Sequence, residues 1–175
     1  RVLAPNVRYF VDNRTIGLFE QGDAQSTVGD FIRLRAWLLA HLMWDPTRDE
    51  KALVAEFLEG YYGPAAPHLQ EHLDVIHDAG EKSGAYLRCF MSDTSAYLTL
   101  DDLNRATRVF AKATEAVADD PITSRRVRRE RMPLDHVWLR RYHALSRAAK
   151  ARQKEFLGPD DPVAACEEFI RLAHE

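Results

Sequence analysis

Residues 31–80, FIRLRAWLLAHLMWDPTRDEKALVAEFLEGYYGPAAPHLQEHLDVIHDAG, decide the fold class of this 175-residue chain. Apolar side chains recur in this stretch every three or four residues, which is the spacing of an amphipathic helix. The pattern predicts helices over 28–44, from about Leu53 to Gly63, and over 64–79. Asp45-Pro46-Thr47 predicts a turn, and Pro64 suits the first turn of the third helix because its missing N–H is not needed there. The three apolar stripes are Phe31, Leu34, Leu38 and Leu42, then Leu53, Val54, Phe57, Leu58 and Tyr61, then Leu69, Leu73 and Ile76.

The rest of the chain continues the helical pattern. We predict a helix over 100–118, a long element from Ile122 to Phe156 and a short final helix from Val163 to Ala173. Pro133 lies inside the long element, removes a backbone donor and should kink it. The chain is therefore predicted to be mainly α, a helical bundle.

The first 27 residues follow a different pattern. Residues 5–13 predict a short helix, and the apolar run at 16–19 predicts a buried parallel strand that ends in a polar loop. A single strand has nothing to pair with, so this unit is incomplete by itself. We therefore divide the chain into residues 1–27, a helix–strand unit, and residues 28–175, a helical domain.

Composition and charge exclude several classes of protein. The chain is 46% hydrophobic and 29% charged, which is typical of a globular protein and not of a disordered one. Its net charge of −3 creates no global attraction to nucleic acid or anionic membrane, and its apolar runs are shorter than the ~20 residues of a membrane span. Cys89 and Cys166 lack metal-site spacing and are predicted to be buried thiols, with a disulfide between them left open. The compartment, secreted or cytoplasmic, also stays open.

Two motifs suggest binding chemistry, and each has a simpler interpretation. His68-Leu69-Gln70-Glu71-His72 matches the zinc motif H-x-x-E-H, but three fixed positions often arise by chance and both histidines flank an apolar stripe. A basic stripe along the long helix would suit a polyanion, yet such stripes are more often solvated faces. We predict no metal, no cofactor, no nucleic acid and no membrane partner. The basic stripe consists of Arg125, Arg129, His136, Arg140, His143 and Arg147.

Polar residues directly after the predicted strand are the best candidates for substrate contact. Glu20, Gln21 and Asp23 follow it, and residues past the carboxyl ends of strands face the ligand in barrel and open α/β enzymes. A capped loop that leads into the next helix is an equal alternative. Trp44 is a candidate for stacking on a sugar ring, with core packing as its alternative.

Arg35 is predicted to support this site. It lies within the apolar stripe of 28–44, and an arginine buried without a carboxylate costs several kcal/mol. We therefore expect it to pair with Glu20 or Asp23. The alternative is a side chain whose stem covers apolar surface while its head reaches water.

Three stretches carry a resemblance to a known family: residues 19–22 (FEQG), 38–46 (LLAHLMWDP) and 56–66 (EFLEGYYGPAA). The chain resembles the C-terminal part of a bacterial family of glycosidase-like barrel proteins, similar to α-glucuronidases and β-hexosaminidases and known mainly as a domain of unknown function. The resemblance is clearest over residues 5–80. It implies that residues 5–23 are the last helix–strand unit of a (β/α)₈ barrel, with Glu20 at its catalytic end, and that residues 28 onward pack beside that barrel.

The resemblance implies a helical C-terminal region of a glycoside-hydrolase-like protein that acts on complex carbohydrate. The acid/base pair of such an enzyme would lie on earlier strands, so the chain alone is expected to be inactive and no catalytic residue is assigned. The expected partners are the preceding barrel domain of the same polypeptide and a carbohydrate. A homodimer stays open, because an unpaired strand invites association. The alternative function is a non-catalytic helical binding module that uses its basic face.

Overall fold

Helices make up the regular structure of the chain. The computed structural model describes residues 1–20, 29–87 and 93–174. Their elements in chain order are α1 (Leu3–Asp12), α2 (Ile32–Trp44), α3 (Glu50–Tyr62), the 3₁₀ turn η1 (Gly63–Ala65), α4 (Ala66–Ser83), α5 (Leu100–Glu115), α6 (Pro121–Arg152) and α7 (Pro162–Ala173). The predicted mainly α fold class is confirmed.

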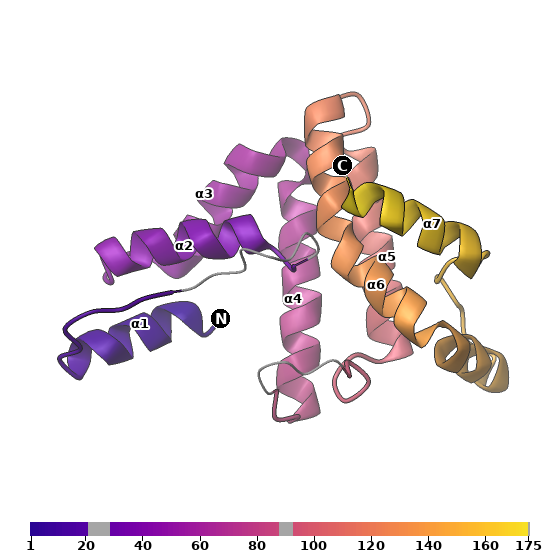
Figure 1. Cartoon of the computed structure of the whole chain (residues 1–175), viewed down its shortest axis with the longest axis horizontal. Coiled ribbons are helices and arrows are strands. Elements are labelled where there is room, and N and C mark those ends of the chain that lie inside the picture. The colour runs from indigo at the N-terminus through magenta and orange to yellow at the C-terminus, as the bar shows by residue number, and fades with distance from the viewer. Residues whose placement is uncertain (21–28, 88–92, 175) are drawn as a thin grey trace.

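Three helices form the centre of the molecule. In Figure 1, α4, α5 and α6 lie side by side, and α5 packs against both of its neighbours. Helices α1, α2 and α3 project from one side of this group, with α3 in contact with α4 and α6. Helix α7 lies against α6 at the other side.

Short polar side chains fix where the helices begin. The carboxylates of Asp49, Asp120 and Asp161 each accept hydrogen bonds from two backbone amides of the helix that follows. Thr99 and Asp102 form a reciprocal capping box at the start of α5. Such caps satisfy amides that have no partner within the helix, each contributing about 1 kcal/mol. At the C-terminal end of α4, Gly84 adopts the left-handed conformation (φ 63°) that glycine tolerates best.

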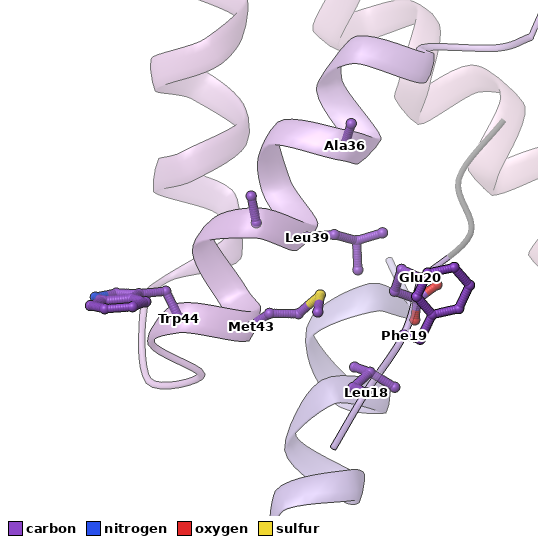
Figure 2. A pocket seen from close by; sticks show the side chains of 8 residues that line it. Leu18, Phe19, Glu20, Ala36, Leu39, Met43 and Trp44 are labelled. Carbon is purple, nitrogen blue, oxygen red and sulfur yellow. The ribbon is translucent and has the colours of Figure 1, made fainter. Parts of the chain in front are cut away.

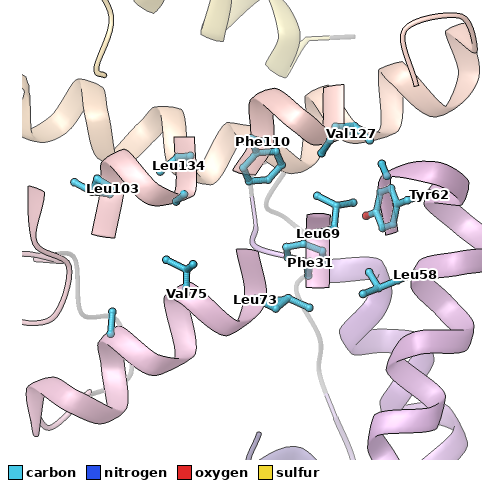
Figure 3. Close-up of a cluster of buried hydrophobic side chains, with 14 of the residues drawn as sticks. Phe31, Leu58, Tyr62, Leu69, Leu73, Val75, Leu103, Phe110, Val127 and Leu134 are labelled. Carbon is cyan, nitrogen blue, oxygen red and sulfur yellow. The ribbon is translucent and has the colours of Figure 1, made fainter. Parts of the chain in front are cut away.

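The apolar stripes meet in two clusters of buried side chains. The larger cluster joins α2, α3, α4, α5 and α6, and its central members are shown in Figure 3. It includes Phe31, Tyr62, Leu69, Phe110 and Trp138, each no more than 2% exposed. The smaller cluster attaches α1 to α2 and α3 and consists of Ala4, Val7, Leu38, Leu42 and Leu53.

The predicted strand at 16–19 is wrong. No β-strand occurs among the described residues, and Ile16 and Phe19 are exposed. The helix half of the predicted unit does form, as α1. A strand requires an edge to pair with, and the described residues provide no second extended segment that pairs with this one. Residues 15–20 therefore run as a non-helical stretch beside α1 and α2.

The C-terminal third differs from the prediction in two details. Helix α6 continues across Pro133 but ends at Arg152, before Phe156, because Gln153 adopts a left-handed conformation (φ 51°). Phe156 then packs edge-to-face on Trp138. Cys166, predicted to be buried, is an exposed free thiol on α7, and Cys89 lies outside the described residues.

Candidate functional site

The structure brings Glu20 and Trp44 to the same groove, between α2 and the stretch that follows α1. This open groove has a volume of about 500 Å³. In Figure 2, Leu39 and Met43 of α2 face Leu18 and Phe19, while Trp44 points away from them at the end of the helix. Its lining is Leu18, Phe19, Glu20, Ala36, Leu39, Ala40, Met43 and Trp44.

The described lining of the groove is mostly apolar. Among these described residues Glu20 is the only acidic one, whereas glycoside hydrolysis uses a pair of carboxyl groups. Phe19 and Trp44 are 86% and 92% exposed, so both rings offer their faces to a partner. Gln21 and Asp23 lie outside the described residues. The groove can thus bind apolar surface, but its described residues do not form an acid/base pair.

The predicted burial of Arg35 is wrong. Leu34 and Leu38 of α2 point into the core, whereas Arg35 is exposed. Within the described part of the chain it forms no ion pair with Glu20, and Asp23 lies outside that part. Because the guanidinium stays in water, it incurs no burial cost that a carboxylate would have to offset.

The motif at 68–72 lies against the core. His72 is 4% exposed, and its ring lies 6.0 Å from that of Phe31 and 4.5 Å from that of Phe110, centroid to centroid. Burial lowers the pKa of His72 to about 4. Among the described residues, no three His, Cys, Asp or Glu side chains are grouped as metal ligands. The core-packing interpretation accounts for His72.

Glu130 is a half-buried acid that the sequence analysis did not single out. It lies on α6, where α2 begins and α3 ends. One of its carboxylate oxygens accepts a hydrogen bond from the backbone N–H of Phe31 at 2.6 Å, and the other accepts from the hydroxyl of Tyr62. Burial raises the pKa of Glu130, while these two bonds and nearby Arg33 oppose the rise. The pKa of Tyr62 is also raised, by burial and by the Glu130 charge.

Glu130 supplies the cap that α2 lacks in its own sequence. Phe31 is the N-cap residue of α2, has a left-handed backbone (φ 46°) and offers no side-chain cap. A carboxylate at a helix N-terminus satisfies an unpaired amide and interacts favourably with the helix dipole. No sequence motif could reveal this contact, because 99 positions separate its two residues.

The basic stripe of α6 lies largely at the surface. Arg125, His136, Arg140, His143 and Arg147 are exposed, and Arg129 is half-buried. His136 stacks on Phe169 of α7, with 6.0 Å between ring centroids. These positions agree with a solvated face. In the described part of the chain, no helix is both long and apolar enough to cross a membrane.

Comparison with known proteins gives one finding. No curated protein sequence matches this chain. No solved structure matches it either. Residues 1–74, which include α1, α2, α3 and the first half of α4, match the model of a family described as a domain of unknown function, DUF4838. The N-terminal part of the chain is therefore similar to that family.

Proposed function

We propose that this chain is the helical C-terminal region of a glycoside-hydrolase-like protein that acts on complex carbohydrate. In this proposal it buttresses a preceding barrel domain of the same polypeptide and does not hydrolyse sugars alone. Residues 1–27 would complete the barrel and residues 28–175 would form the helical domain beside it. Glu20, Gln21, Asp23 and Trp44 would then lie close to the substrate.

The observation that carries this proposal is the exposed apolar face of the first 44 residues. Ile16 is fully exposed, and Phe19, Met43 and Trp44 are exposed around the groove. Tyr9, Phe10 and Val11 of α1 are exposed as well. Contiguous apolar surface of this kind marks an interaction site in soluble proteins. The apolar segment at 16–19 pairs with no other segment among the described residues, so a neighbouring domain that packs on this face would cover it.

Quenching of Trp44 fluorescence tests this proposal. Acrylamide should quench Trp44 readily in the present chain, because its indole is 92% exposed. In a polypeptide that also contains the preceding domain, Trp44 should be protected and its emission should shift to shorter wavelength. The Trp44 signal is obtained as the difference between the natural chain and a Trp44→Phe variant.

A variant with both Trp37→Phe and Trp44→Phe leaves Trp138 as the internal reference, which is 1% exposed and should be protected in both polypeptides. Equal quenching of Trp44 with and without the preceding domain would show that this face is not the contact. Hydrolysis of glycosides by the isolated chain would contradict the proposal that the chain is inactive by itself.

The basic stripe supports a second candidate, a non-catalytic module that binds an acidic polysaccharide. Arg140 and Arg147 are exposed on α6 and form no ion pair within the described residues, whereas Arg1, Arg105 and Arg108 each pair with carboxylates. Binding of alginate should weaken steeply with added salt, and an Arg140→Gln, Arg147→Gln variant should bind less. Arg105→Gln is the matched control, and equal weakening by the control would exclude the stripe.

A further inference from the structure

Two arginines from distant parts of the chain converge on Tyr61. Arg33 lies in the first turn of α2, Tyr61 in the last turn of α3 and Arg126 near the start of α6. The guanidinium carbons lie 5.7 Å (Arg33) and 4.2 Å (Arg126) from the centroid of the tyrosine ring. Three helices therefore bring two positive charges to one point on the surface.

Tyr61 holds both guanidinium groups in place. Its hydroxyl accepts a hydrogen bond from Nη1 of Arg33, and its backbone carbonyl accepts one from Nη1 of Arg126 at 2.9 Å. The ring is itself fixed, because Phe57 stacks on it with 5.2 Å between centroids and Tyr62 meets it edge-on. Arginine side chains positioned by aromatic contact lose less conformational entropy when they bind a ligand.

The donors of these two arginines are mostly unused. Each guanidinium carries five N–H donors, and only one hydrogen bond is formed by each within the described residues. Neither lies within ion-pairing distance of a described carboxylate, in contrast to Arg1, Arg48, Arg105 and Arg108. Glu130 lies near Arg33 on the buried side, but its two oxygens are bonded to Phe31 and Tyr62.

We propose that Arg33 and Arg126, positioned by Tyr61, form a binding site for a small oxyanion, a carboxylate or a phosphate group. Planar guanidinium forks match both groups and bind them through paired, charge-assisted hydrogen bonds. Arg33 is exposed and Arg126 is half-buried, so the site is accessible from solvent. This inference does not depend on the proposed carbohydrate function, because none of these three residues lines the groove at Trp44.

Calorimetric titration of the whole chain with inorganic phosphate and, separately, with malonate tests the site at constant ionic strength. We expect saturable binding of at least one anion, and the stronger of the two identifies the preferred group. Arg33→Gln should weaken binding by about tenfold or more, the usual effect of losing a charge-assisted hydrogen bond. Arg33→Lys should restore only part of the affinity, because lysine keeps the charge and loses the fork.

Three further variants make the result specific. Arg126→Gln should weaken binding as Arg33→Gln does, and Tyr61→Phe should weaken it less, because only the hydroxyl that orients Arg33 is lost. Arg35→Gln is the matched control, an exposed arginine two positions along the same helix, and should bind as the natural chain does. Absence of saturable binding to both anions would overturn the proposal. So would equal weakening by Arg33→Gln and Arg35→Gln, since only the general positive potential would then act.

Discussion

His72 is a polar residue whose ring packs in the core as an aromatic side chain would. Its Nδ1 is buried and has no hydrogen-bond partner among the described residues. The pKa is about 4 in the folded protein and 6.5 in the unfolded chain, so between these values the unfolded state binds more protons. Folding stability should therefore fall as the pH is lowered from 6.5 to 4, by up to about 3 kcal/mol.

A His72→Phe variant should lose this part of the acid sensitivity, because phenylalanine cannot take up a proton. It should also be as stable as the natural chain at pH 7, since the ring still packs between Phe31 and Phe110. Urea unfolding at pH 4.5 and pH 7 measures both effects. His143→Phe serves as a control on an exposed histidine, and a similar change in its pH profile would mean that burial of His72 is not the cause.

Gly158 is required by a close approach of side chains. A Cβ atom at this position would lie 2.5 Å from the ring of Phe156 and 2.8 Å from that of Trp138. Gly158→Ala should therefore lower the free energy of unfolding by about 1–3 kcal/mol, the usual cost of overpacking. Gly60→Ala, inside α3 with nothing within 4 Å of the new Cβ, should instead stabilise by about 0.5–1 kcal/mol. Thermal denaturation of both variants checks the opposite signs.

At the scale of the helices, Glu130 joins the start of α2 and the end of α3 to α6. Glu130→Ala would leave the Phe31 amide and the Tyr62 hydroxyl without their acceptor, and should cost about 2 kcal/mol or more. Glu130→Gln should cost less, because its amide oxygen can accept from Phe31 and its NH₂ can donate to Tyr62. Denaturant unfolding of the two variants at pH 5 gives this comparison.

Glu130 also makes stability depend on pH in the direction opposite to His72. Its pKa is raised above the ordinary 4.5, so above that pH the folded state holds the proton longer than the unfolded chain. Stability from this group should fall as the pH rises through the raised pKa, and Glu130→Gln should remove that fall. Glu59→Gln, at an exposed site on α3, is the control. A profile unchanged in Glu130→Gln would show that Glu130 ionises normally.

The sequence predicted most helices because their apolar residues recur at helical spacing. Periodicity located α2, α3, α4, α5 and α7, although α4 extends past the predicted end at residue 79 and ends at Ser83, before Gly84. The strand at 16–19 was wrong because an apolar run shows only that a segment prefers burial. Whether it forms a strand depends on a pairing edge, and that information is not local. Arg35 was predicted to be buried because it lies within the apolar stripe of α2. Only part of that stripe is buried in the structure, and Arg35 lies outside the buried part.

At the scale of the whole molecule, two apolar clusters of unequal size should differ in stability. Helix α1 is held by Ala4 and Val7, by bonds from Arg8 to the carbonyls of Pro46 and Arg48, and by ion pairs of Arg1 with α4. Its amides should exchange with solvent deuterium sooner than those of α4 and α5, which lie in the larger cluster. Val7→Ala should speed exchange in α1 alone, whereas Leu69→Ala should speed it throughout. Equal exchange in α1 and α4 would show one cooperative unit.

Part of the candidate sites could be recognised from the sequence. Glu20 and Trp44 were both singled out and share a groove. Glu130 and the pair of Arg33 and Arg126 were not recognisable, because each contact joins helices that are far apart in the sequence. Arg126 is one of several arginines at 125–131, and the sequence does not distinguish it from the others. It differs because α3 packs on α6 and brings the carbonyl of Tyr61 to its guanidinium.

The hydrogen bonds of Glu130 bear on where this protein can be divided. The region shared with the domain family ends at residue 74, in the middle of α4. The backbone N–H of Phe31 and the hydroxyl of Tyr62 both lie within that region. Both donate hydrogen bonds to Glu130, which lies 56 positions beyond its end. A fragment of this chain that ended at residue 74 would therefore lack the acceptor of both groups.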